Sequence, residues 1–401
     1  MADSFLLLGE DGKTTLAPVN EAPGFTKPTG GLRSRVAYAA AHVAPIAWAD
    51  NTPGQPATID WDATLAFRRN VYSWGLGVAD AMDTAQRNMG IDATAVRELI
   101  ARSAEVAHEE GGSVAVGVNT DHIDDEIITL QQVIDGYVYQ LEHAEEHGTV
   151  PVLMASRHLA RIATGAEDYR KVYREVLAKA TGQVVLHWLG TAFDPILEGY
   201  FGSSDWHVSG DTVVEIITEN QAKIAGIKMS LLDADSEVYV RERLPEGVRM
   251  FTGDDFNYVG LIGGADVPQA EQPARSEGTT RTHSDALLGA FAAITPVASA
   301  AIQALDAGDS QRYYDLLQPT EALSRQVFAA PTFYYKTGVA FLAWLNGHQA
   351  AFQMIGGLHS ARSLPHLSKI VELANNAHAL EKPELAVQRW NDYLKLNGFT
   401  A

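Results

Sequence analysis

The alternation of two kinds of segment constrains the fold of this chain more than any other feature. Short apolar or β-branched runs recur eight times, and most are flanked by segments whose apolar residues fall at helical spacing. The runs cover residues 35–40, 77–82, 113–118, 150–154, 183–188, 224–229, 248–252 and 289–295. Such alternation favours parallel strands joined by right-handed crossovers. Eight units predict an α/β fold, a closed (β/α)8 TIM barrel. A Rossmann fold is disfavoured because no glycine-rich fingerprint follows the first run.

The pattern changes along the chain and predicts three regions. After Pro296 only helical segments remain. We expect an N-terminal extension over residues 1–30, a barrel domain over residues 31–305, and a C-terminal helical region packed on the barrel over residues 306–401. A polar stretch rich in Pro, Gly, Ser and Thr covers residues 264–285. Loops of this length are often lids, so we expect this one to be mobile and to gate the mouth of the barrel.

Composition narrows the classes of partner. Asp and Glu number 50 against 30 Lys and Arg, which gives a formal net charge of −20. Nucleic acid and anionic membranes both require a basic face, so neither is expected as a partner. The chain has no cysteine, which excludes disulfides, thiolate metal sites and thiol nucleophiles. The apolar stretch 286–305 is alanine-rich and interrupted by Pro296, which favours a buried strand and helix over a membrane span. No signal peptide is recognised at the start, and we expect a cytoplasmic protein.

Polar residues directly follow most of the predicted strands. Active sites of such barrels gather where the strands end, so these residues are expected to converge on one mouth. They are His42, Asp83, Thr84, Asn119, Asp121, His122, Arg157, His158, His187, Lys228, Asp254 and Asp255. A single histidine in such a place is more often structural than functional, and the two aspartates of residues 252–255 would also suit a helix N-cap.

Lys228 is the most informative of these residues, because it directly follows the apolar run 224–227. Lysine is rarely buried. One interpretation is that its stem lines the strand while its amine reaches solvent. The other is that burial lowers the pKa of the amine and leaves a nucleophile that forms a Schiff base with a carbonyl substrate.

Several segments resemble the dihydrodipicolinate synthase and N-acetylneuraminate lyase superfamily of class I aldolases. The most specific is GIKMS at residues 226–230, at the end of the sixth strand; it implies Lys228 as the Schiff-base lysine. Further segments are similar to the family's first two strands, its seventh strand, its eighth helix and its C-terminal helices. They cover residues 42–86, 251–265, 295–317 and 334–347. The resemblance covers most of the chain, implies no cofactor, and implies a homo-oligomer, a dimer or tetramer.

The departures from the family bear on the substrate. Where the family has a proton-relaying tyrosine after strand five, this chain has His187, which can do the same acid–base work. Of the family's paired hydroxyls after strand two only Thr84 matches, and Asp83 would repel a carboxylate. The synthase's arginine after strand five is absent. Gly253 and Asp255 match the turn where the sugar-acid lyases hold substrate hydroxyls. A polyhydroxylated, less acidic carbonyl compound fits these differences.

Two functions follow, from different classes. The first is a Schiff-base lyase or aldolase acting on a small carbonyl compound, with Lys228 and His187 as catalytic residues. Its substrate-binding residues would be His42, Asp83, Thr84, Asn119, His122, His158, Gly253 and Asp255. The second is a metal-dependent barrel isomerase or hydrolase with Asp83, His42, His122, His158 and His187 as ligands, since histidines and a carboxylate on separate strands can make such a site. A binding protein without catalysis is a third interpretation.

Overall fold

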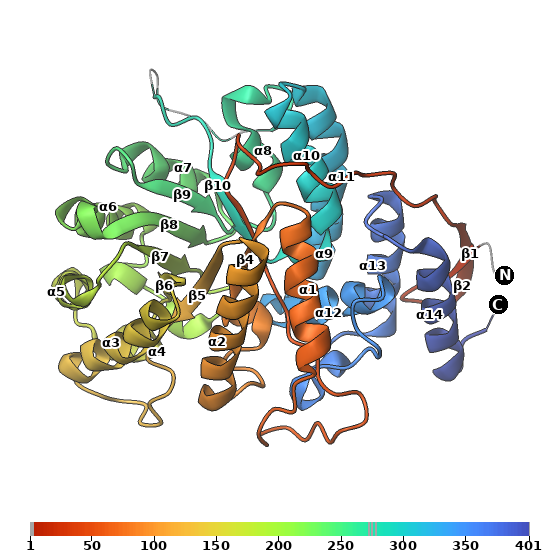
Figure 1. Ribbon diagram of the computed structural model, residues 1–401, viewed down its shortest axis with the longest axis horizontal. Helices are drawn as coiled ribbons and strands as arrows, with labels where there is room; N and C mark the ends of the chain where they lie inside the picture. The colour runs from red at the N-terminus through yellow and green to blue at the C-terminus, as the bar shows by residue number, and fades with distance from the viewer. Residues whose placement is uncertain (1–3, 272, 274–275, 277–278, 401) are drawn as a thin grey trace.

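Eight parallel strands close into a barrel in the computed structural model, which describes residues 4–271, 273, 276 and 279–400 (Figure 1). The predicted (β/α)8 barrel is therefore confirmed. Each strand pairs with its neighbours in the sequence, and the last pairs with the first. The strands are β3 (Ala37–Ala40), β4 (Gly77–Asp80), β5 (Val114–Val118), β6 (Val150–Leu153), β7 (Val184–Leu189), β8 (Ile224–Ser230), β9 (Arg249–Thr252) and β10 (Asp285–Leu288).

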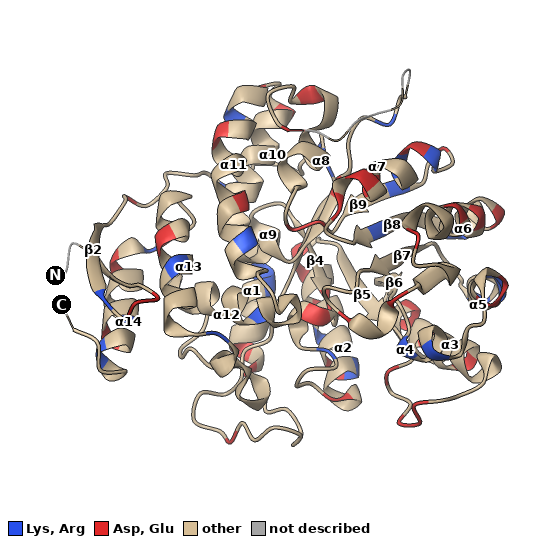
Figure 2. Ribbon diagram, turned by 180° about the vertical axis from the view of Figure 1, so that it is seen from behind, with Lys and Arg blue, Asp and Glu red and all other residues tan. Residues whose placement is uncertain are grey.

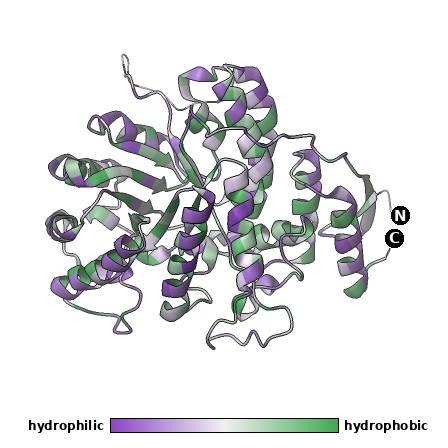
Figure 3. Cartoon of the chain, viewed as in Figure 1, coloured by the Kyte–Doolittle hydropathy of each residue, from purple (hydrophilic) through white to green (hydrophobic). Residues whose placement is uncertain are grey.

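Amphipathic helices cover the outside of the barrel. Figure 3 shows apolar strands at the centre and helices striped with apolar and polar residues, and Figure 2 shows acidic positions on the outer helices α6 and α7. Side chains of Asp60, Asp92, Thr129 and Asp233 accept hydrogen bonds from first-turn N–H groups, which fixes where four of the helices begin. The helices are α1 (Trp61–Ser73), α2 (Ala93–Glu110), α3 (Leu130–Glu146), α4 (Arg157–Ile162), α5 (Ala166–Lys179), α6 (Trp206–Glu219), α7 (Ala234–Arg243) and α8 (Tyr258–Gly263).

The eighth strand lies earlier in the chain than predicted. Residues 289–295, predicted as strand, contain α9 (Ala290–Ala293) and the start of α10 (Thr295–Asp306), whereas β10 is Asp285–Leu288. Alanine favours helix, and periodicity alone does not separate a buried strand from a buried helix in an apolar run. The same break divides the apolar stretch 286–305. Among the described residues, no helix combines the length and the apolarity needed to cross a membrane.

The polar stretch 264–285 is not placed to gate the mouth, so that prediction is wrong. It connects α8 to the start of β10 and therefore lies at the amino-terminal end of the barrel, opposite the mouth. Arg281 accordingly donates hydrogen bonds to the carbonyls of Pro245 and Val248, which precede β9. The predicted mobility of residues 264–285 stays a prediction; residues 272, 274, 275, 277 and 278 of this stretch lie outside the described part of the chain.

The two ends of the chain pack together beside the barrel (Figure 1). The C-terminal helices are α11 (Ser310–Val327), α12 (Tyr335–Leu345), α13 (Leu364–Asn376) and α14 (Pro383–Leu396), and the N-terminal hairpin is β1 (Ser4–Leu8) with β2 (Thr14–Pro18). The hairpin is tied to these helices. Leu8 N–H donates to Ser368 Oγ at 2.7 Å, and Trp390 Nε1 donates to the Leu6 carbonyl at 2.7 Å.

Helix α12 connects this C-terminal region to the barrel. All of its residues are buried. Its first residue, Tyr335, forms a 2.7 Å hydrogen bond with the hydroxyl of Thr84, in the short 3-10 helix η1 (Asp83–Ala85) that follows β4. The start of α12 therefore lies at the carboxyl ends of the strands, where a barrel carries its active site.

Candidate active site

Lys228 lies inside the barrel, in one layer with His187 and Phe251. The register pairs His187 on β7 with Lys228 on β8, and Lys228 with Phe251 on β9. Phe251 belongs to the small apolar cluster that fills the barrel interior. Because side chains at paired positions of neighbouring strands point to the same face of a sheet, all three side chains point inward.

The Lys228 amine is partly buried, and opposing effects act on its pKa. Its side chain is half-buried and forms no ion pair with any described residue. Burial lowers the pKa of Lys228, while the carboxylates of Asp255 and Asp83 act in the opposite direction. Lowering of this kind increases the neutral fraction of an amine, and the neutral amine is the nucleophile.

Gly253 makes room for this lysine. A Cβ at this position would lie 2.7 Å from Lys228 Cε and 2.2 Å from Ser230 Oγ. Any side chain here would displace both groups, so the need for glycine after β9 is steric. Gly253 thus leaves room for both groups because it lacks a side chain, and the substrate contact predicted for it stays a prediction.

His187 is buried, and one of its ring nitrogens is free. Its Nε2 lies 3.2 Å from Ser230 Oγ, and its Nδ1 has no hydrogen-bond partner among the described residues. Burial, with the nearby charge of Lys228, holds the pKa of His187 well below its usual value. The imidazole is therefore neutral at physiological pH and can accept a proton.

Asp255 is buried near Lys228. Its Oδ1 accepts a 2.8 Å hydrogen bond from Ala290 N–H. Burial raises the pKa of Asp255 to about 7, although the hydrogen bond and Lys228 oppose this. Near neutral pH this carboxyl exchanges a proton readily, and in either form it can bind a hydroxyl group.

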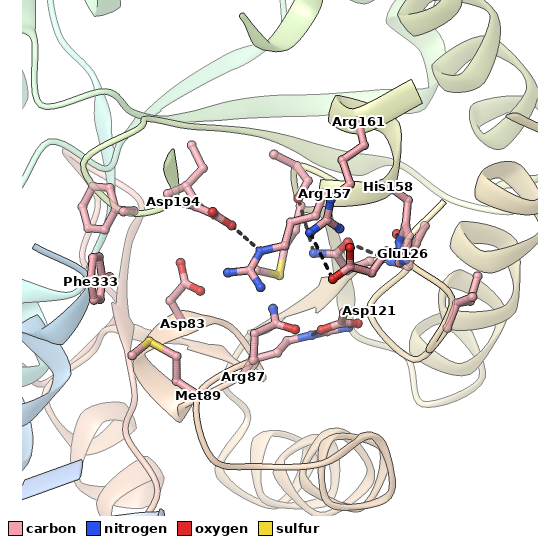
Figure 4. Close-up of a pocket in the computed structure, with 18 of the residues that line it drawn as sticks. Asp83, Arg87, Met89, Asp121, Glu126, Arg157, His158, Arg161, Asp194 and Phe333 are labelled. Atoms are coloured by element: carbon pink, nitrogen blue, oxygen red, sulfur yellow. Dashed lines mark hydrogen bonds and ion pairs between the residues drawn. The ribbon is translucent and has the colours of Figure 1, made fainter. Parts of the chain in front are cut away.

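A polar cavity of about 210 Å³ opens above this layer. Leu189, two residues beyond His187 on β7, lines it, so His187 and Lys228 lie deeper in the barrel. The volume is below the roughly 300–1,000 Å³ of pockets for drug-sized ligands, which favours a small ligand. Figure 4 shows the cavity with Asp83, Arg157 and Asp194 at its centre and Asp121, Glu126 and His158 along one side. Asp83 lines the cavity, and its carboxylate also raises the pKa of Lys228, against the effect of burial. It therefore acts on both the cavity and the lysine.

The start of α12 supplies two further groups to the cavity, Tyr335 and Lys336. Tyr335 bonds to Thr84, and burial raises its pKa well above 10, so the phenol is protonated and can donate. Lys336 is 1% exposed, and its Nζ contacts Met89 Sδ at 3.1 Å. Burial lowers the pKa of Lys336, against the opposing effect of Asp83.

The predicted site residues divide into three groups. Lys228, His187, Asp83, Thr84, Gly253 and Asp255 are brought together around the barrel axis. Asn119 and His158 line the cavity wall, but both ring nitrogens of His158 already bond to Thr120 and to the carbonyl of Asp125. His122 and His42 do not line the cavity. His122 faces a neighbouring outer cleft. His42 bonds to Gln349 and packs edge-on against Phe67 of α1.

The alternative prediction of a histidine metal site has no ligand cluster to support it. Within the described residues, no three or more His, Asp or Glu side chains are grouped so that they could hold a metal ion. The ring of His42 faces α1 and that of His158 is engaged on both sides, so the four predicted histidines do not meet.

Three functional candidates were missed by the sequence analysis: Ser230, Tyr335 and Lys336. Ser230 lies two residues after Lys228 on the same face of β8, and that spacing was the available signal. Lys336 stands in the apolar sequence YKTGVAFLAWL, the same conflict between charge and surroundings that singled out Lys228.

The barrel and its C-terminal helices have the fold of solved dihydrodipicolinate synthase structures. Dihydrodipicolinate synthase from Oceanobacillus iheyensis matches with a TM-score of 0.60 and 12% identity, over 86% of this chain and 96% of that one. The synthase from Bacillus anthracis gives 0.60 and 16%, over 84% and 96%. PhdJ bound to a substrate intermediate gives 0.61 and 11%, over 90% and 99%. The resemblance to this superfamily is thus confirmed in the fold.

The chain itself belongs to the family described as "Protein of unknown function (DUF993)", which matches residues 5–399. No curated protein matches the sequence.

Proposed function

We propose that this chain is a class I lyase, in which Lys228 forms an imine with a small carbonyl compound. The observation that carries the proposal is the position of Lys228. It is a half-buried amine without an ion-pair partner among the described residues, at the mouth end of a barrel strand and beside His187 in register. The fold shared with dihydrodipicolinate synthases and PhdJ supports the reaction class but leaves the substrate open.

The chemistry follows from the states of the neighbouring groups. The neutral Lys228 amine attacks the carbonyl carbon, and loss of water from the carbinolamine gives an iminium ion. The iminium withdraws electrons, so a bond from the adjacent carbon can break and leave an enamine. Proton transfer to that carbon and hydrolysis by water then release the product and the amine.

Two groups can move the protons: His187, which is paired in register with Lys228, and Tyr335, which lines the cavity. Neutral His187 accepts through Nδ1, whereas protonated Tyr335 donates while Thr84 orients it. Asp255 can hold a substrate hydroxyl, as expected for a sugar-derived substrate.

Reductive trapping tests the proposal. Purified protein is incubated separately with pyruvate, 2-oxobutanoate and dihydroxyacetone, reduced with borohydride, digested, and analysed by mass spectrometry. We expect an adduct on Lys228 with at least one compound and none in Lys228→Arg, which keeps the charge but cannot form the imine. Turnover without any adduct, stopped by a chelator, would favour the metal-dependent alternative instead.

A further inference from the structure

Arg157 and Lys336 are two cations that line the same cavity, Arg157 with a 42% exposed side chain and Lys336 at 1% exposure. Arg157 begins α4, after the fourth barrel strand, and Lys336 lies in the first turn of α12. They are brought together only by the docking of α12 against the barrel mouth, since 179 positions separate them in the sequence, the difference between 336 and 157.

Arg157 presents a free donor pair. Its Nε is bound to Asp194 Oδ2 at 2.5 Å, and its two terminal nitrogens have no hydrogen-bond partner among the described residues. In Figure 4 the guanidinium points into the cavity on the side of Asp83. Two parallel terminal N–H groups match the two oxygens of a carboxylate.

Lys336 presents a buried amine that has no carboxylate partner in the described part of the chain. Its Nζ is within hydrogen-bond distance of the thioether sulfur Met89 Sδ and lies 5.3 Å from the Tyr335 ring centroid. A buried ammonium without an anionic partner is costly. The residues within its electrostatic reach are Asp83 and Arg157. Lys336 therefore shares the cavity with a second cation, an arrangement that an anionic ligand would stabilise.

The geometry points to an anion subsite formed by Arg157 and Lys336, which binds a carboxylate group of the substrate while its carbonyl reacts at Lys228. The reaction of the carbonyl at Lys228 rests on the proposed function, whereas binding of an anion by Arg157 and Lys336 does not. Asp194 and Asp83 lie beside the two cations, whereas the lining acids Asp121 and Glu126 are paired with Arg87 and Arg161. A planar monoanion therefore fits better than a doubly charged phosphate, which these acids would repel.

A matched pair of probes tests the subsite. The ketones 4-oxopentanoate and its methyl ester differ in one negative charge, and the amount of borohydride-reduced adduct on Lys228 reports occupancy. We expect Lys336→Met and Arg157→Gln to raise the half-saturating concentration of 4-oxopentanoate by roughly 10- to 100-fold, as for lost hydrogen bonds to charged groups, and to leave that of the ester unchanged. Lys369→Met, on the surface of α13 and paired with Glu372, is the control. Equal losses for both probes, or reduction onto Lys336 itself, would overturn the subsite.

Thermal stabilisation by glutarate, which has carboxylates but no ketone or aldehyde group, separates the subsite from the lyase proposal. We expect glutarate to raise the melting temperature of the wild type but not of Lys336→Met. If it does so while no adduct forms on Lys228, the lyase proposal fails and the subsite stands. A larger effect of methylphosphonate than of glutarate, or no Lys336-dependent effect of glutarate, would overturn the assignment.

Discussion

Gly253 is the residue at which a single added methyl group should be most damaging. Gly253→Ala would place a Cβ 2.2 Å from Ser230 Oγ and 2.7 Å from Lys228 Cε, and 2.8 Å from the carbonyl of Met229. The carbonyl belongs to the barrel backbone and cannot move freely. We expect a loss of about 1–3 kcal/mol in the free energy of unfolding and a larger loss of imine formation, because the lysine is displaced. Denaturant titration and borohydride trapping measure the two effects.

The matched control is Gly165→Ala, at a position where an added Cβ meets nothing within 4 Å. This variant should keep both stability and trapping. Trapping at the wild-type level in Gly253→Ala would show that Lys228 is not confined as described.

His187 should contribute by accepting a proton through Nδ1. His187→Ala is therefore expected to lower kcat by ~10²–10⁴-fold, the usual contribution of a positioned acid or base, while the adduct on Lys228 still forms. The pKa of His187 lies well below 6.5. The pH dependence of kcat near pH 6.5 should therefore be the same in the wild type and in His187→Ala. Ser230→Ala removes only the contact to Nε2 and should have the smaller effect; the reverse order would contradict the assigned role.

At the scale of single residues, part of the candidate site could be predicted from the sequence. A lysine at the end of an apolar strand is a local conflict, and barrel topology says where strand ends meet, so Lys228, His187, Asp83, Thr84 and Asp255 could be grouped. The contributions of α12 could not be. Its sequence predicts a buried helix, but periodicity does not say where that helix docks, and the contact between Thr84 and Tyr335 spans 251 positions. The direction of a side chain could not be predicted from the sequence either. His42 was therefore expected at the barrel mouth, whereas its ring contacts Gln349 and Phe67.

At the scale of elements, seven strands were predicted close to their observed bounds because strands of a parallel barrel are buried on both faces and read as continuous apolar runs. The prediction of the eighth strand was wrong because the alanine-rich sequence of residues 289–295 is compatible with both helix and strand. The hairpin of β1 and β2 was not predicted, since it is stabilised by residues more than 350 positions away, such as Ser368 and Trp390.

The hairpin should stabilise the C-terminal region through Trp390. In Trp390→Phe the carbonyl of Leu6 loses its buried donor and part of the indole volume becomes a cavity. We expect the free energy of unfolding to fall by about 1–3 kcal/mol, measured by chemical denaturation, with trapping at Lys228 retained because the contact is remote from the mouth. Leu396→Ala, at an 85% exposed position of the same helix, is the control. Equal effects of the two substitutions would mean that the hairpin contact contributes nothing.

At the scale of the whole molecule, self-association remains a prediction whose basis has changed. The apolar tail that suggested it is covered within the chain, since every residue of α12 is buried. Among the described residues, the exposed large apolar side chains are instead Leu16, Trp48, Ile127, Tyr139, Ile196, Val208 and Leu396. We expect a dimer or tetramer by light scattering at micromolar concentration, and partial dissociation of it in Trp48→Ser, whose parent side chain is 86% exposed. A monomer would contradict the prediction.

The contribution of Glu237 to the stability of the fold should fall as pH rises towards neutrality, because its carboxyl group is buried. Burial raises the pKa of Glu237 from 4.5 to about 7, and its Oε1 accepts from Ser284 Oγ, just before β10. Above about pH 4.5 the unfolded chain releases this proton while the folded chain keeps it, so the contribution of Glu237 is full below that pH and is lost by about pH 7.

Glu237→Gln cannot ionise. Its free energy of unfolding relative to the wild type should therefore rise between pH 5 and pH 8, by on the order of 1–3 kcal/mol. Denaturant titrations at the two pH values measure this, and Glu321→Gln, at another buried acid whose pKa burial raises to about 7, should change in the same direction. A difference between Glu237→Gln and the wild type that is independent of pH would show that Glu237 is ionised in the folded barrel.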